Sequence, residues 1–157
     1  MSTHLATYLA LADHSECTLA DSLHTVGQGH AEHPDVLFTC QALEAMSRDH
    51  VNRLAAVVRR YGEQDDGSLE EPERLRGSGI GETRTGPVGM LRDLQDLHLL
   101  ATLVQTTWTV IGQGAQGLRD DELFALAKQG MTDTARQISW LTTRMKSAAP
   151  QALIVSP

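Results

Sequence analysis

The chain has few aromatic residues, few cysteines and no excess of basic charge. Aromatic residues make up 4% of its 157 residues, so its core must be built mainly from Leu, Val, Ala and Met. The formal net charge of −7 argues against a nucleic-acid partner and against docking on an anionic membrane, because both need clustered Lys and Arg. Cys17 and Cys40 lack metal-type spacing and would be offset by more than a turn on a helical hairpin, so we expect no disulfide.

The chain also lacks a signal peptide pattern and a membrane-spanning apolar run. Its N-terminus has no basic region, and Asp13, His14 and Glu16 interrupt the apolar pattern there. Since reduced cysteines are typical of the cytosol, the sequence predicts a cytoplasmic protein with no membrane partner.

Apolar residues instead recur in alternating steps of four and three residues. This spacing is typical of amphipathic helices packed in a bundle. The first stripe comprises Leu5, Leu9, Ala12, Leu19, Leu23 and Val26, and the second comprises Val36, Cys40, Leu43, Leu54, Val57 and Tyr61.

Four long helices are predicted, over about residues 3–28, 34–62, 87–116 and 120–148. Pro34 and Pro87 suit the first turn of a helix, and the acidic run 120–122 suits the positive end of the helix dipole. Short links join the first pair and the last pair, and a Gly-rich, charged segment over 63–86 separates the pairs. We therefore predict one all-α domain over 1–157, an antiparallel four-helix bundle with a long crossover between helices two and three.

The third helix is apolar nearly all round. Its main stripe includes Leu94, Leu97 and Val104, whereas Leu99 and Leu103 lie on the other side. Because such a helix is usually covered on both faces, we expect a homodimer through this helix. We also expect the tail over 149–157, with its apolar run 152–155, to pack back on the bundle or to meet a partner.

Polar residues interrupt the first two stripes at their middle. Glu16 occupies the first stripe, and Ser47 and His50 occupy the second. Folding the first hairpin about residue 31 brings Glu16 level with about position 46, within a turn of Ser47 and His50. A carboxylate in such a stripe is costly unless it is paired, so we expect these residues to meet in one buried polar site.

The second hairpin adds polar residues at the same height. Folding it about residue 118 brings Asp133 level with Leu103 and near Gln105. Arg136 lies one turn after Asp133 and could neutralise a carboxylate there. All four helices would then carry polar groups at mid-length.

This arrangement resembles the ferritin-like superfamily, whose di-iron members carry a Glu on helices one and three and a Glu-x-x-His on helices two and four. Glu16 matches the first Glu. The segment Ser47–His50 keeps the His but has Ser for Glu, and Asp133–Arg136 has Asp for Glu and Arg for His. Helix three offers only Thr102 or Gln105. The resemblance implies a ferritin-like bundle with an incomplete di-iron site.

Two functional readings follow from the resemblance. The first is a non-enzymatic binding or accessory protein that has lost its di-iron centre, with a small-molecule or protein partner. The second is a metal-binding oxidoreductase or metal-storage protein that holds Fe, Mn or Zn at Glu16, His50 and Asp133. The same polar residues could also form a hydrogen-bonded pair that fixes helix register, or line a small-ligand pocket. The sequence leaves enzymatic activity open.

Other histidine-based readings are weaker. A phosphotransfer bundle would expose its histidine and follow it with Gly, whereas His50 lies on the buried stripe and Leu54 takes the glycine position. Hemerythrin-like bundles need histidine pairs on a late helix, and no histidine follows His98. We interpret His30, in the first hairpin turn, as a solvated loop residue and Asp93 as part of a polar helix edge.

Overall fold

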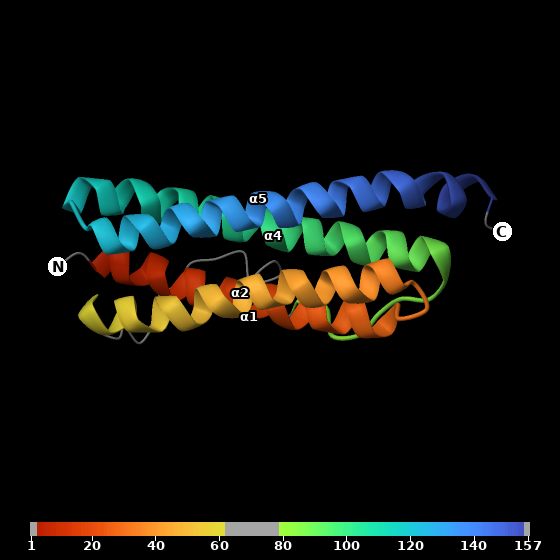
Figure 1. The fold of residues 1–157 in the computed structure, drawn as a ribbon, viewed down its shortest axis with the longest axis horizontal. Helices are drawn as coiled ribbons and strands as arrows, with labels where there is room; N and C mark the ends of the chain where they lie inside the picture. The colour runs from red at the N-terminus through yellow and green to blue at the C-terminus, as the bar shows by residue number, and fades with distance from the viewer. Residues whose placement is uncertain (1–2, 62–78, 156–157) are drawn as a thin grey trace.

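The computed structural model describes residues 3–61 and 79–155, and it confirms the prediction of an all-α chain with four long helices. These are α1 (Thr3–Gly29), α2 (Pro34–Tyr61), α4 (Gly86–Leu118) and α5 (Asp121–Pro150). They lie side by side as a bundle, in which α1 packs against α2 and α4, and α5 packs against α4 and α2. In Figure 1, α1 and α5 run from left to right, and α2 and α4 run from right to left.

The helix ends follow from local sequence. Pro34 opens α2, which has Asp35 in its first turn and arginines in its last turn, so both ends suit the helix dipole. The side chain of Asp120 caps α5 by accepting a hydrogen bond from the amide of Leu123 at 3.0 Å. Arg119, at a φ of 57°, turns the chain between α4 and α5.

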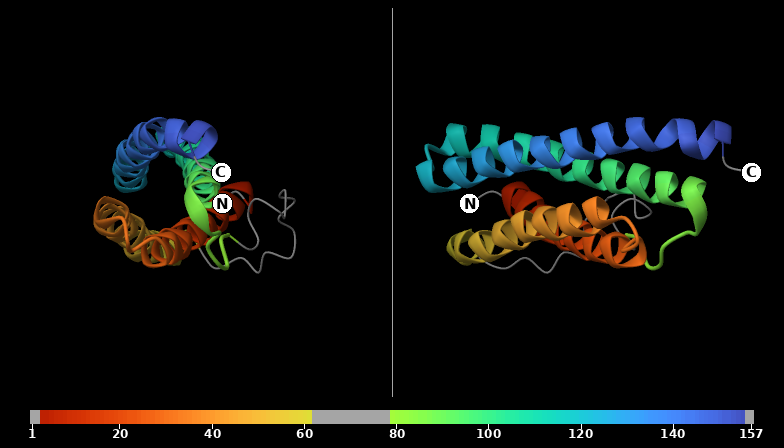
Figure 2. Two further views of the ribbon diagram at one scale, coloured as in Figure 1. Left: turned by 90° about the vertical axis from the view of Figure 1, so that its right-hand side faces the viewer. Right: turned by 45° about the vertical axis from the view of Figure 1, so that its right-hand side comes forward.

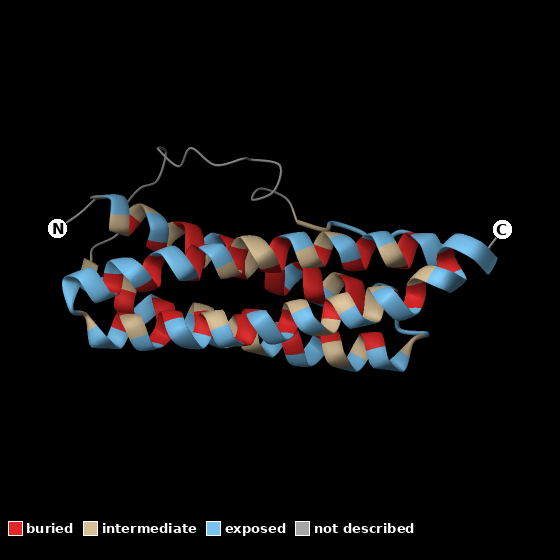
Figure 3. Ribbon diagram, turned by 90° about the horizontal axis from the view of Figure 1, so that it is seen from above, coloured by how far each residue is buried: buried red, intermediate tan, exposed pale blue. Residues whose placement is uncertain are grey.

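Buried residues recur at short intervals along every helix, as the red bands of the ribbon in Figure 3 show. The core contains the predicted Leu, Val and Ala residues, together with Trp108. Cys17 and Cys40 are free thiols. Within residues 3–61 and 79–155, no helix combines the length and apolarity that crossing a membrane requires.

The crossover and the tail are described in part. Of the predicted crossover, residues 63–78 lie outside the described residues, and 79–85 form a loop that leads into α4. Helix α5 continues to Pro150, past the predicted helix end near residue 148, and a π-helical turn, η1, follows over Gln151–Val155. Ala152 packs back on the bundle, whereas Leu153, Ile154 and Val155 are exposed. The right-hand view of Figure 2 places this turn beyond the α1–α2 connection.

Candidate functional site

A cluster of ionisable side chains lies in the middle of the bundle and joins three helices. It consists of Glu16 from α1, His50 from α2 and Asp133 from α5, which we call the carboxylate–histidine cluster. Nδ1 of His50 hydrogen-bonds to Oε2 of Glu16, and Nε2 of His50 lies 2.8 Å from Oδ2 of Asp133. Glu16 and His50 are fully buried, and Asp133 is 7% exposed. The imidazole therefore bridges two carboxylates.

This geometry sets the charge of the imidazole. An ionised carboxylate only accepts hydrogen bonds, so both ring nitrogens must donate, and His50 is then an imidazolium. Burial lowers the pKa of His50, but its hydrogen bonds to Glu16 and Asp133 and the negative charges of both outweigh burial and raise this pKa above its usual value.

A neutral donor contacts each of the two carboxylates. The indole N–H of Trp108, on α4, donates to Oε2 of Glu16 at 3.1 Å, so all four helices contribute to the site. The Trp108 ring also meets the His50 ring edge-on, with centroids 6.1 Å apart. The side-chain amide of Gln129 donates to Oδ1 of Asp133 at 2.9 Å. These contacts orient both carboxylates toward the imidazolium.

A second polar layer lies one turn away. The side-chain amide of Gln137 donates to Oγ of Ser47 and to the backbone carbonyl of Leu43, both at 3.0 Å. Ser47 and Gln137 are fully buried. Two buried oxygens, Oε1 of Glu16 and Oε1 of Gln137, have no hydrogen-bond partner among the described residues. Each could still accept a hydrogen bond from a small donor.

Two predicted members of the site lie elsewhere. Arg136 is exposed, and its side chain makes no hydrogen bond or ion pair within the described part of the chain. Gln105 is only half-buried and contributes a backbone carbonyl to Thr109 rather than a side-chain contact. The expected neutralisation of Asp133 by Arg136 is therefore wrong, because the rotation of α5 turns Arg136 to solvent and Asp133 toward His50.

The cluster does not present a metal-ligand set. No group of three His, Cys, Asp or Glu side chains in residues 3–61 and 79–155 is arranged to hold a metal ion. A histidine ligand must offer a free lone pair to the metal, and both nitrogens of His50 are engaged by carboxylates. The predicted ligands Glu16, His50 and Asp133 are thus brought together, but with the imidazolium between the carboxylates, where a metal ion would have to lie.

A second buried cluster was missed in the sequence. Nε2 of His30 lies 2.8 Å from Oδ2 of Asp93, and both residues are buried. Asp93 also accepts from the backbone N–H and the guanidinium of Arg84, at 3.0 and 2.8 Å, and the same guanidinium reaches Asp96. The interpretations of His30 as solvated and of Asp93 as a polar edge are therefore wrong. These contacts join the α1–α2 connection to the start of α4.

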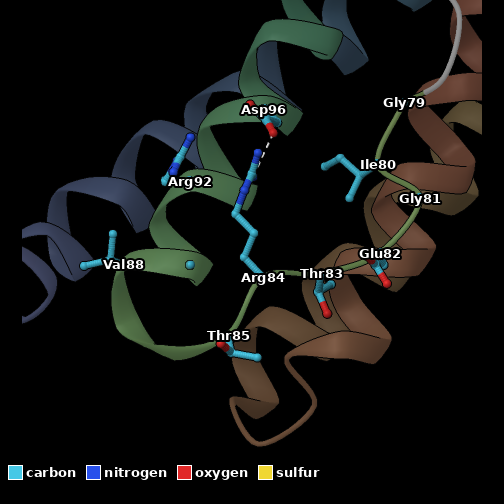
Figure 4. Close-up of a pocket in the computed structure, with 11 residues that line it drawn as sticks. Gly79, Ile80, Gly81, Glu82, Thr83, Arg84, Thr85, Val88, Arg92 and Asp96 are labelled. Atoms are coloured by element: carbon cyan, nitrogen blue, oxygen red, sulfur yellow. Dashed lines mark hydrogen bonds and ion pairs between the residues drawn. The ribbon is translucent and has the colours of Figure 1, made fainter.

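The loop before α4 forms one wall of a groove of about 820 Å³, shown in Figure 4. Arg84 reaches toward Asp96, Ile80 points into the groove, and Arg92 lies on the opposite wall. Gly79 has a φ of +55°, and a Cβ there would lie 2.6 Å from Oγ of Ser22, which also accepts from the Ile80 amide. The glycine thus lets the loop close on α1.

A signal in the sequence could have identified Gln137. The buried residues of α5 include Gly130, Thr134, Gln137 and Leu141, which continue the alternation of four and three. Gln137 interrupts that stripe as His50 interrupts its own. Trp108 lies on the buried stripe of α4, and its donor role depends on where its indole N–H points, which spacing does not reveal.

No protein-family model, curated protein or solved structure matches this chain.

Proposed function

We propose that this chain is an antiparallel, ferritin-like bundle protein of non-enzymatic binding or accessory type, in which an imidazolium occupies the position of a lost metal centre. The observation that carries the proposal is His50, which bridges Glu16 and Asp133 at mid-bundle. In di-iron members of the superfamily the metals lie at this level, between carboxylates from facing helices. An imidazolium can replace part of their positive charge.

Burial supports a structural rather than a catalytic role for the cluster. Glu16 and His50 are fully buried, and only Asp133 has an exposed edge. The groove beside α4 is not lined by any of the three. We therefore assign binding to surfaces such as this groove, and register and stability to the cluster. Free Cys17 and Cys40 support a reducing, cytoplasmic location.

One observation favours the alternative of a metal-binding oxidoreductase or storage protein. Oε1 of Glu16 is a buried carboxylate oxygen without a partner among the described residues. A carboxylate oxygen is a donor that Fe(II), Mn(II) and Zn(II) accept. Binding would require His50 to lose a proton and release one carboxylate.

Elemental analysis separates the two functions. The protein is loaded with Fe(II), Mn(II) or Zn(II), desalted and analysed. The proposal predicts that the protein retains no metal at His50, so that any metal left after desalting is retained equally by wild type and H50A. About one equivalent per chain, lost in E16A and H50A but kept in H4A, would instead establish the metal-binding alternative. Zinc binding that is lost in a H24A/H33A variant would be binding by these two surface histidines. Thermal unfolding with and without metal provides a second readout.

A further inference from the structure

We propose that the outward face of α4 is a self-complementary surface that binds a second copy of this chain about a two-fold axis. The face is centred on Leu99, Leu103, Thr106, Val110 and Gly114, which recur in steps of four, three, four and four. We call it the α4 outer face. It is separate from the carboxylate–histidine cluster, and the proposal does not depend on the function assigned above.

Large apolar side chains remain exposed on this face. Leu99 and Val110 are each 49% exposed, and Leu103 is half-buried. The opposite side of α4 is filled by the core, including Leu97, Val104 and Trp108. A helix that is apolar on both sides needs a cover on both sides. Within the described part of the chain, the core covers the inner side of α4 and leaves the outer side exposed.

The charge pattern selects the partner. From Leu99 to Leu118 the sequence contains no Asp, Glu, Lys, Arg or His. A basic or acidic partner would therefore find no opposite charge here. Two copies that each carry a formal charge of −7 repel one another over most of their surfaces, but least where neither surface is charged. Since a 20-residue helix is about 30 Å long, the uncharged stretch suits a long helix–helix contact.

The order of side chains makes the face complementary to itself. When two α4 helices pair in opposite directions about an axis beside Thr106, residues whose numbers sum to 213 face each other. Leu99 then faces the partner's Gly114, and Leu103 faces the partner's Val110, twice in the dimer. A Cβ at Gly114 would meet nothing within 4 Å, so the glycine leaves room for the leucine. The outer pairs of the seam thus place a leucine against a glycine, and the inner pairs place a leucine against a valine.

Light scattering coupled to size exclusion tests the dimer. We expect about twice the chain mass of 17.1 kDa at tens of micromolar protein. Leu103→Lys and Val110→Glu should each give a monomer with an unchanged helical spectrum, because the dimer would bury two unpaired charges. The matched controls Ala135→Lys and Ala125→Glu, at exposed positions on α5, should remain dimeric.

Mixing the two variants tests the register. In a mixed pair the new lysine faces the new glutamate, while the unchanged Leu103 and Val110 still meet on the other side of the axis. A one-to-one heterodimer, captured through a tag on one variant, is therefore expected. A monomeric wild-type protein, dimers that survive both substitutions, or a mixture that stays monomeric would each overturn the proposal.

Discussion

The indole ring of Trp108 lies directly against Gly130, on the facing helix. A Cβ placed on Gly130 would lie 2.7 Å from Cδ1 and from Cγ of the indole. The ring is fully buried, and from this position its N–H reaches Glu16. The absence of a side chain at one residue of α5 therefore sets the position of a hydrogen-bond donor to a carboxylate of α1.

Gly130→Ala should destabilise the protein by about 1–3 kcal/mol, because the added methyl group overpacks the indole. This loss should exceed the gain of up to about 1 kcal/mol that alanine brings to a helix interior. Urea unfolding, followed by circular dichroism and Trp fluorescence, measures the unfolding free energy of the variant and of wild type. Gly117→Ala is the matched control, since a Cβ there meets nothing within 4 Å, and it should not lower stability. Equal stability of both variants would contradict the packing argument.

His50→Ala should cost about 3–5 kcal/mol of unfolding free energy, because it leaves two buried carboxylates without their cation. Replacing the whole group with apolar residues, as in E16M/H50L/D133L/W108F, should restore stability to within about 2 kcal/mol of wild type. Urea unfolding of the two proteins provides the comparison. If His50→Ala were as stable as wild type, the cluster could not be fixing the register of the helices.

Stability should fall as pH rises above neutrality, because the pKa of His50 is higher in the folded than in the unfolded protein. Below the usual value of 6.5 the imidazole is protonated in both states and the stabilisation is complete. Above it the folded protein holds the extra proton, and the stabilisation is lost as pH passes through the folded pKa. The slope is at most about 1.4 kcal/mol per pH unit.

Urea midpoints between pH 6 and about pH 7.5, where unfolded cysteines with a pKa of about 8.5 stay mostly protonated, measure this slope. Burial raises the pKa of Cys40 to about 12, which keeps its folded thiol outside the window. His50→Gln should remove the slope that wild type shows, and Asp133→Asn should reduce it. A slope unchanged in His50→Gln would assign the pH dependence to another group.

Asp93→Ala should cost about 3–5 kcal/mol, whereas Asp96→Ala should cost less than about 1 kcal/mol. Both carboxylates bind the guanidinium of Arg84, but Asp93 is fully buried and also holds His30 and the Arg84 amide, and Asp96 is 40% exposed. Urea unfolding measures the difference. Trypsin cleavage after Arg84 should accelerate only in Asp93→Ala. Equal cleavage of the two variants would show that Asp93 does not hold this loop in place.

Periodicity predicted the helices because burial of one face repeats every three or four residues whatever the helix packs against. It also identified Glu16, Ser47 and His50, since a polar residue in a buried stripe needs a partner. Asp133 was reached instead from its level in the second hairpin. The axial level of these residues follows from the length of each hairpin, because the rise per residue of a helix is constant. Spacing alone predicted that Glu16 lies near the height of Ser47 and His50, whereas the packing of the two hairpins decided that Asp133 contacts His50.

The rotation of each helix about its axis was decided by tertiary packing. Asp133 and Arg136 are three residues apart and therefore lie about 60° apart around α5, and no local rule sets which of the two faces inward. The same packing selected Trp108 rather than Gln105 as the α4 donor and buried His30 against Asp93, 63 residues away. The sequence by itself thus determined which residues are helical and how high they lie. Only the tertiary structure decided which side chains meet, because contacts between helices depend on the shapes of all four faces at once.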